Sequence, residues 1–260
     1  MITSAHNPRL KELRKLHDRK HRERTGLFTA EGEDLLAEAL RFGVAPRAVF
    51  HDLALTPDSP PLRDLPAGVD VVAVEREALE RVSALGSGTR LIGLWEEAAV
   101  APAVEMREVV VYMHEISDPG NVGSVLRSAL ALAPSTVVLS PGSSDPFAPK
   151  AVRASMGAVF GQPFARMRFD QLAALTTDAR TVALVPGAGT PLPDLDLEPP
   201  LVFCLGAERA GLPEEIAGAC DERAHVPMRT DGAESLNVAM TATLCLYQTG
   251  FASRRSCESA

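Results

Sequence analysis

Apolar side chains in the first hundred residues alternate between helical and strand-like spacing. Three leucines at helical intervals, Leu10, Leu13 and Leu16, predict a helix over residues 8–24. A short strand and a helix that ends at Gly43 follow. Further strands are expected at 48–50, 69–74 and 90–96, a helix at 75–85, and a proline-rich surface loop at 55–66. The alternation predicts a compact unit in which helices layer on a sheet.

A second series of strands and helices follows a small, proline-containing linker near residues 98–107. Its apolar segments lack the polar alternation of a half-exposed strand, so they predict a mostly parallel sheet that is buried on both faces. The expected strands are 108–114, 136–140, 181–186, 201–206 and 223–227. The expected helices are 121–133, one within 144–160, 170–179, a short one after 212–216 and a long closing helix from about Ser235. The pattern predicts two α/β domains, 1–100 and 107–260.

Charge is spread unevenly along a chain whose formal net charge is -8. Residues 1–25 hold eight Lys and Arg against three acidic residues, whereas the remainder holds 18 against 31. A basic N-terminal segment in an otherwise acidic chain suggests that one surface of the protein binds a polyanion. A solvated helix face is an equally good interpretation of the same charges.

Targeting and metal signals are weak. No apolar run approaches the roughly 20 residues of a membrane helix, and the N-terminus lacks the apolar segment of a signal peptide, so a cytoplasmic protein is expected. The cysteines are far apart and show no metal-ligand spacing, so they are interpreted as reduced packing residues, with no metal site: Cys204, Cys220, Cys245 and Cys257.

Three turns marked by Gly or Asn each follow a predicted strand: DPGNVG at 118–123, GAERAG at 206–211 and MRTDGAESLN at 228–237. Because ligands of an open parallel sheet sit beyond the carboxyl ends of its strands, the turns are expected to converge. GAERAG is not the dinucleotide fingerprint GxGxxG, since Glu208 would meet the pyrophosphate. No GxxxxGK[ST] sequence occurs, so phosphoryl transfer from a P-loop has no support.

Each turn also has a purely structural interpretation. Asn121 can cap a helix that carries Arg127 on its solvent-exposed face. Ser235 and Asn237 can cap the closing helix. His114 and Glu115 invite an acid–base interpretation, but strand alternation points them to opposite faces, which favours a structural role.

Taken together, the turns resemble the three signature motifs of the SpoU, or TrmH-like, family of RNA 2'-O-ribose methyltransferases within the SPOUT superfamily. The motifs are Asn121 with Arg127, the GAERAG turn, and Pro227 and Met228 followed by SLNV at 235–238. The segment DPFAPKAVRASMGAVF is similar to the connecting segment of that family. The N-terminal half resembles the L30e-like substrate-binding domain of ribosomal-RNA members, including the thiostrepton- and avilamycin-resistance type, which the short tRNA enzymes lack.

The resemblance implies a C-terminal α/β domain tied in a deep trefoil knot, S-adenosylmethionine as cofactor, and a homodimer. Composition and periodicity do not indicate a knot, because connections do not generally thread through one another. The implied catalytic residues are Arg127, Asn121, Glu208, Ser235 and Asn237. The implied cofactor-binding residues are Gly187, Leu205, Gly206, Val226, Met228 and Leu236. Family proposals assign to Arg127 the role of a base. Because arginine is essentially never neutral near pH 7, a role as a cation that stabilises developing alkoxide charge is physically easier. The sequence does not separate the two roles.

The expected function is S-adenosylmethionine-dependent methylation of a ribose 2'-hydroxyl in structured RNA, with 23S ribosomal RNA favoured. RNA contacts are expected from Arg9, Arg19, Lys20, Arg22, Lys150 and Arg153. A tRNA enzyme and a catalytically silent RNA-binding or ribosome-assembly protein are the alternatives. A small-molecule enzyme with a dinucleotide cofactor is disfavoured by the missing phosphate fingerprint. Housekeeping modification and antibiotic resistance stay equally open.

Overall fold

The computed structural model describes residues 1–56, 58–86, 88–100, 106–233 and 235–258. The chain forms two compact units, one of residues 1–101 with 145–161 and the other of residues 102–144 with 162–260. The segment 145–161 lies within the second domain expected from the sequence, yet its contacts are with the first hundred residues. Among the described residues, no helix is both long and apolar enough to cross a membrane.

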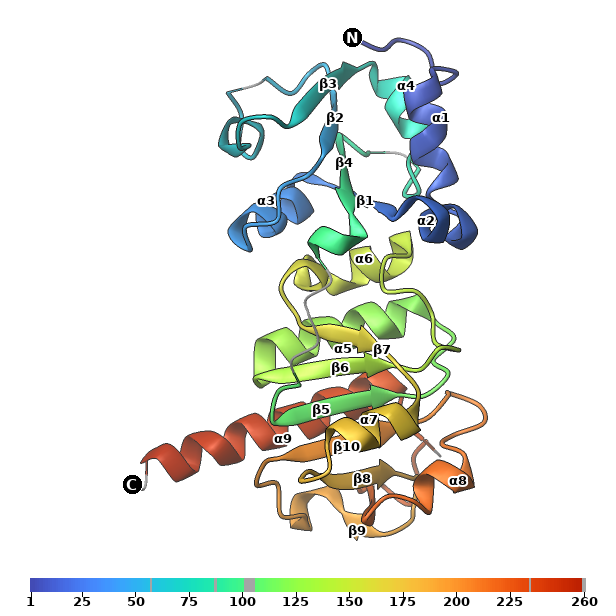
Figure 1. Cartoon of the computed structure of the whole chain (residues 1–260), viewed down its shortest axis with the longest axis vertical. Coiled ribbons are helices and arrows are strands. Elements are labelled where there is room, and N and C mark those ends of the chain that lie inside the picture. The colour runs from blue at the N-terminus through green and yellow to red at the C-terminus, as the bar shows by residue number, and fades with distance from the viewer. Residues whose placement is uncertain (57, 87, 101–105, 234, 259–260) are drawn as a thin grey trace. The chain divides into compact units, whose positions relative to one another are not determined.

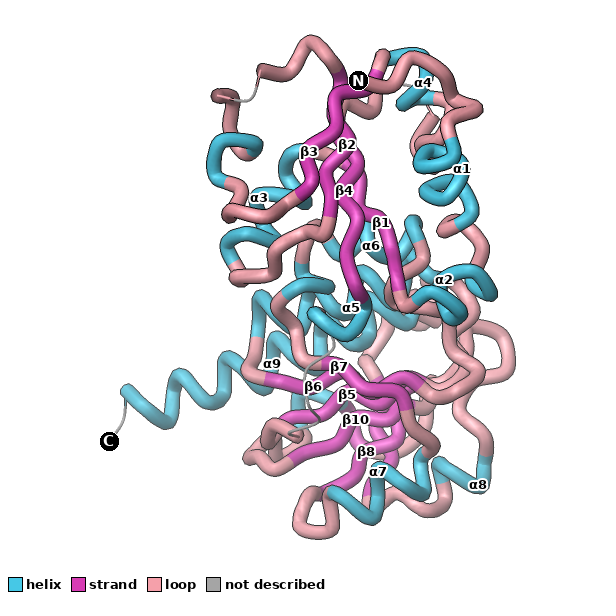
Figure 2. Tube along the Cα trace, turned by 45° about the horizontal axis from the view of Figure 1, so that its top comes forward, coloured by secondary structure: helices cyan, strands magenta, loops and turns pink. Residues whose placement is uncertain are grey.

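The smaller unit is built on a four-stranded sheet in the order β1-β4-β2-β3, in which only β2 and β3 run parallel. Figure 2 shows these strands side by side with helices on either side. Its strands are β1 (Leu27–Glu31), β2 (Ala48–Asp52), β3 (Asp70–Val74) and β4 (Leu91–Glu96). Its helices are α1 (Pro8–Lys15), α2 (Arg19–Thr25), α3 (Glu33–Arg41), α4 (Arg76–Glu80) and α6 (Pro149–Ser155).

The basic segment expected as one helix over 8–24 is two helices. Asn7 caps α1 by accepting from the Arg9 backbone N–H, and Asp18 caps α2 by accepting from that of Lys20. A cap side chain competes with helix continuation, so Asp18 starts a new helix instead of lying within one. The apolar spacing survives this break, because Leu10 and Leu13 are buried in the core.

Arg22 is a structural residue of the smaller unit. Its side chain is only 3% exposed, and its Nε and Nη2 atoms donate to Asp145 Oδ2 at 2.8 and 2.6 Å. Its Nη1 atom donates to the carbonyl oxygens of Leu16 and His17. The expectation that Arg22 binds RNA is therefore wrong, because burial and four internal bonds occupy its guanidinium group.

We expect Arg22→Ala to lower the free energy of unfolding by about 3 to 5 kcal/mol, because the change leaves the largely buried Asp145 carboxylate without its partner. Arg19→Ala is the matched control, since Arg19 and Glu23 form an ion pair in which both side chains are about half exposed. Such a pair is worth less than about 1 kcal/mol. Urea titration of both variants measures the difference, and equal midpoints would contradict this account of Arg22.

The larger unit is an α/β layer structure whose seven-stranded sheet has the order β7-β6-β5-β10-β8-β11-β9. Every paired strand in it is parallel, which confirms the expected parallel sheet. Its strands are β5 (Val109–Met113), β6 (Ser135–Leu139), β7 (Phe164–Arg166), β8 (Arg180–Leu184), β9 (Thr190–Pro191), β10 (Leu201–Leu205) and β11 (Glu222–His225). The short edge strands β7 and β9 were not predicted, because two or three residues carry no periodic signal.

Helices cover both faces of this sheet. Figure 1 shows α7 (Phe169–Leu175) and α8 (Glu214–Ala217) on one face, with α5 (Pro119–Leu132) and α9 (Val238–Glu258) on the other. The first face is sealed by a cluster that joins Val110, Tyr112, Val202 and Cys204 to Leu172 of α7. Burial from both sides explains the uniformly apolar strands, because neither face meets water.

Candidate functional site

The turns after β5, β10 and β11 meet at the carboxyl ends of these strands. Asn121 Nδ2 donates to Glu208 Oε1 at 2.6 Å, and Asn237 Nδ2 donates to Asn121 Oδ1 at 3.0 Å. Three segments that are far apart in the sequence are thus joined by two side-chain hydrogen bonds. The expected convergence of the three turns is confirmed.

Asn121 does not begin its helix, contrary to the structural interpretation of this residue. Helix α5 begins at Pro119, and Asp118 is the cap, whose Oδ1 accepts from the Gly120 backbone N–H at 2.7 Å. Proline suits the first helical position because its missing N–H has no helical partner there. Since Asp118 supplies the cap, the Asn121 amide is available to the other turns.

Asn237 is both a cap and a member of the site. Its Oδ1 accepts from the Ala239 backbone N–H at 2.8 Å where α9 begins, while its Nδ2 reaches Asn121. The closing helix starts at Val238, so Ser235 lies before the helix and lines the cavity described below. Capping and site formation are therefore compatible roles of one side chain.

The segment that leads into α5 is held by side-chain hydrogen bonds to the neighbouring loop. The Glu115 backbone N–H donates to Ser140 Oγ, and that of Ile116 donates to Ser143 Oγ. Arg166 braces the same loop by donating to the carbonyl oxygens of Ser140 and Ser143. Glu115 has a φ of 50°, a conformation that non-glycine residues rarely adopt, so these bonds stabilise a strained entry to the helix that carries Asn121.

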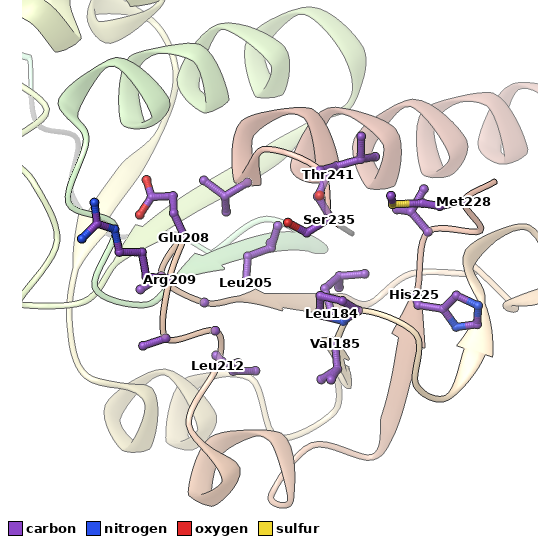
Figure 3. Close-up of a pocket in the computed structure, with 18 residues that line it drawn as sticks. Leu184, Val185, Leu205, Glu208, Arg209, Leu212, His225, Met228, Ser235 and Thr241 are labelled. Atoms are coloured by element: carbon purple, nitrogen blue, oxygen red, sulfur yellow. The ribbon is translucent and has the colours of Figure 1, made fainter. Parts of the chain in front are cut away.

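A cavity of about 490 Å³ opens beside this network. Figure 3 shows Glu208 and Arg209 at one end and Met228 and His225 at the other. Five of the six predicted cofactor-binding residues line it: Leu205, Gly206, Val226, Met228 and Leu236. Gly187 does not line the cavity, whereas its neighbour Pro186 does. The volume lies within the range of about 300 to 1,000 Å³ that small-molecule sites occupy.

Gly206 permits two stretches of backbone to touch at the cavity wall. A Cβ atom at this position would lie 2.1 Å from the Gly211 carbonyl carbon and 2.1 Å from the Leu212 nitrogen. An isolated β-bridge between Ala207 and Gly211 closes the same turn. The glycine is therefore required by close backbone approach, which agrees with its interpretation as something other than an anion cradle.

The structure adds lining residues that the sequence did not suggest, notably Arg209, His225 and Thr241. His225 is the last residue of β11, and its Nδ1 lies 3.3 Å from the Ala188 carbonyl oxygen. The rule that ligands meet carboxyl ends of strands points to this position, because the predicted strand 223–227 included it. Thr241 lies within a helix, so only the packing of α9 brings it to the cavity.

Arg127 is not brought into the cavity. It lies on α5, is exposed, and has no hydrogen bond or ion pair to the part of the chain that the structure describes. Glu208 does not hold it, because the carboxylate accepts from Asn121 and, at 3.4 Å, from Ser117. A separation of six residues turns the helix by about 600°, so Asn121 and Arg127 project in different directions.

His114 and Glu115 lie in different surroundings just beyond β5, which ends at Met113, so strand alternation does not apply to them. The His114 ring lies beside Tyr112, with 3.5 Å between Nδ1 and the hydroxyl oxygen, whereas Glu115 is exposed. Burial raises the pKa of the Tyr112 hydroxyl to about 12, so this group stays neutral at physiological pH.

Within the described residues, no cluster of His, Cys, Asp or Glu side chains has the arrangement of a metal site. Cys204 and Cys245 are buried free thiols, and Cys220 is a half-buried one. The side chain of Cys257 lies outside the described part.

The remaining predicted RNA contacts are exposed residues of the smaller unit. Arg9 forms an ion pair with Asp70 and Arg19 with Glu23, both at the surface. Lys20 is exposed on α2, and Lys150 and Arg153 are exposed on α6.

Two families match the chain, one in each half. Residues 108–247 match the SpoU rRNA Methylase family, and residues 7–93 match the MRM3-like substrate binding domain. The first match spans more than half of the chain and contains all three turns that form the site.

Similar proteins extend over nearly the whole chain. The 23S rRNA (guanosine(2553)-2'-O)-methyltransferase RlmP of Bacillus subtilis is 29% identical, over 95% of this chain and 97% of that protein. The crystal structure of AdoMet-bound rRNA methyltransferase from Sinorhizobium meliloti is 28% identical and has a TM-score of 0.82. The match covers 95% of this chain and 96% of that one. The SpoU methyltransferase AviRb from Streptomyces viridochromogenes, solved with AdoMet, has a TM-score of 0.81 at 25% identity and covers 96% and 100%.

Proposed function

Because the chain belongs to the SpoU rRNA methylase family, we propose that it transfers a methyl group from S-adenosylmethionine to a ribose 2'-hydroxyl of 23S ribosomal RNA. The observation that carries the proposal is the junction of Asn121, Glu208 and Asn237 beside a cavity that residues of the turns at 206–211 and 228–237 line. The names of the relatives support ribosomal RNA as the substrate class.

The cavity fits this cofactor on the chemistry of its lining. Leu205, Val226 and Leu236 offer apolar contact to an adenine ring, while backbone groups near Gly206 can read its edge. The Glu208 carboxylate at one end disfavours a pyrophosphate and is compatible with a cationic sulfonium. When bound, S-adenosylmethionine would supply a methyl group on a positively charged sulfur.

The residues around the cavity would orient the attacking ribose and stabilise the negative charge that develops on its 2'-oxygen. A neutral 2'-hydroxyl is a poor nucleophile, so it must lie about 3 to 3.5 Å from the methyl carbon and would lose its proton to solvent as the oxygen–carbon bond forms and the carbon–sulfur bond breaks. Glu208 fixes the Asn121 amide, and Asn237 fixes the Asn121 carbonyl, so these side chains form a preorganised edge for the nucleotide. We assign to Arg127 the role of a cation that holds a phosphate and stabilises the alkoxide. Ser235, which lines the cavity, would contact the nucleotide or shape the cofactor turn.

The proposed function is tested by incubating the purified protein with labelled S-adenosylmethionine and unmodified RNA. We expect label to enter 23S ribosomal RNA in preference to tRNA and to map to one alkali-resistant linkage, which marks a 2'-O-methylated ribose. Transfer to tRNA alone would favour the tRNA alternative. RNA binding without any transfer would favour a silent RNA-binding or assembly protein.

We expect Asn121→Asp to lower the rate of methyl transfer by about ten- to a hundredfold at pH 8, the worth of a lost hydrogen bond to a charged group. The variant places a carboxylate where the amide now donates to Glu208 at 2.6 Å. Two carboxylates so close cannot both stay ionised at low cost, so the loss should shrink as pH falls and the pair takes up a proton.

Ser117→Ala is the control for Asn121→Asp, because Ser117 makes only a 3.4 Å contact with Glu208. The pH dependence of single-turnover rates measures both variants. A pH-independent loss in Asn121→Asp would contradict the role of the Asn121–Glu208 contact.

The protein is further proposed to be a cytoplasmic homodimer whose catalytic domain carries a trefoil knot, with residues 1–100 as the RNA-binding domain and 107–260 as the catalytic one. Family resemblance supports the knot, which would involve the GAERAG turn, β11 and α9. For the dimer, α9 offers exposed apolar side chains at helical spacing, Met240, Leu244 and Tyr247. Light scattering that reports a monomer would contradict the dimer.

A further inference from the structure

A second cavity, of about 410 Å³, lies in the smaller unit between its first two helices and one face of its sheet. Its floor is a row of side chains that face one another across three strands, since Leu94 pairs with Ala48 and Ala48 pairs with Asp70. Phe50 lies two residues further along β2 and lines the same cavity. Leu13 of α1 and His21 of α2 contribute to its walls. The interior is therefore mainly apolar and backed by the core of the unit.

Arg9 provides a flat, oriented surface at this cavity. Its guanidinium carbon lies 4.9 Å from the centre of the Phe50 ring, and its Nη2 atom donates to Asp70. Phe50 is only 2% exposed, whereas the Arg9 side chain is 44% exposed. The guanidinium group is thus held between two partners, while much of its side chain still faces solvent. Unpaired bases stack on such arginine planes.

The charges around the cavity favour a neutral ligand that has both donors and acceptors. Arg9 and Arg47 bring donors to the lining, and Glu12 and Asp70 bring acceptors of opposite charge. A phosphate group would meet these two carboxylates, whereas the edge of a nucleobase can satisfy both kinds of partner. Exposed basic residues on the two helices that wall the cavity, Lys20 of α2 among them, suit the flanking phosphates.

We propose that this cavity binds one unpaired nucleobase of the substrate RNA, stacked on the Arg9 guanidinium plane above the Leu94–Ala48–Asp70 row. The inference rests on the proposed function and adds to it a means by which the smaller unit selects the RNA. A base that is splayed out of a loop is the form in which single-stranded RNA is usually read. Arg9 accordingly contributes the flat face of its guanidinium group as well as its positive charge.

The test compares Arg9→Lys with Arg14→Lys in the full-length protein. Both changes keep a positive charge on α1, but only Arg9 lines the cavity and lies over the Phe50 ring. Arginine and lysine are not equivalent at a stacked site, since lysine has no plane. We measure affinity for a 23S ribosomal RNA transcript that the unaltered protein methylates, by anisotropy of a labelled transcript, and cofactor affinity by calorimetry.

We expect Arg9→Lys to weaken RNA binding by about ten- to a hundredfold, the usual effect of losing one stacked base. Arg14→Lys should bind as the unaltered protein does, and both variants should bind S-adenosylmethionine normally. Thr25→Trp, which narrows the cavity without changing any charge, should weaken RNA binding as well.

Equal RNA affinities of Arg9→Lys and Arg14→Lys would overturn the base pocket while leaving the methyltransferase function intact. Undiminished binding by Thr25→Trp would also overturn it. Absence of methyl transfer and of RNA binding in the unaltered protein would instead overturn the proposed function and the pocket together.

Discussion

Arg127→Ala is expected to lower methyl transfer by about a hundred- to a thousandfold, the effect of removing a group that stabilises transition-state charge. Arg127 is exposed and engages no described residue, so its charge is available to RNA. Because it does not line the cofactor cavity, the affinity for S-adenosylmethionine should be nearly unchanged. Single-turnover transfer and calorimetric titration measure the two quantities.

Arg127→Lys tests the role of the charge, since lysine keeps a cation but loses the planar fork. Partial recovery of the rate relative to Arg127→Ala supports charge stabilisation. Arg168→Ala is the control, because Arg168 is an exposed arginine of the same unit that forms an ion pair with Asp170. Undiminished transfer by Arg127→Ala would refute the catalytic assignment of Arg127.

Gly206→Ala is expected to abolish measurable cofactor binding and to destabilise the protein by about 1 to 3 kcal/mol, the usual cost of overpacking. The new Cβ would lie 2.1 Å from backbone atoms of Gly211 and Leu212, and backbone cannot rotate away as a side chain does. Opening the turn to relieve this contact would displace the wall that Leu205 and Gly206 form. Thermal unfolding and calorimetric titration with S-adenosylmethionine report the two effects.

Gly232→Ala is the matched control for Gly206→Ala. A Cβ atom at Gly232 would meet Arg229 atoms only at 3.4 and 3.5 Å, which is ordinary contact, and the residue does not line the cavity. This variant should bind the cofactor as the unaltered protein does. Normal cofactor affinity in Gly206→Ala would show that the GAERAG turn does not form the binding wall.

Much of the architecture was predictable because it follows from short-range patterns. Uniformly apolar segments predicted a parallel sheet covered on both sides, and the observed sheet is of that kind. Helix boundaries were less well predicted, since they depend on single cap residues. Asp18 divides the first basic segment, and Asp118 starts α5 before Asn121.

The residues of the candidate site were partly predictable. Turns after strands predicted that the segments holding Asn121, Glu208 and Asn237 converge, because parallel strands place their carboxyl ends on one edge. The resemblance to the methyltransferase family singled out these three residues within the turns. Whether an individual basic side chain is buried or exposed was not predictable. Arg22 and Lys20 are two residues apart in one basic segment, yet the Arg22 guanidinium is buried against Asp145 while Lys20 is exposed.

The sequence by itself determined the α/β class, the three turns and the basic character of the N-terminal segment, because each follows from residue type and spacing within a few neighbours. Only the tertiary structure decided which polar side chains meet, since Asn121 and Asn237 are 116 positions apart. It also decided that Arg9 lies over the Phe50 ring beside a cavity and that Arg22 is buried. Burial and pairing depend on which distant segments pack together, and local periodicity carries no information about that choice.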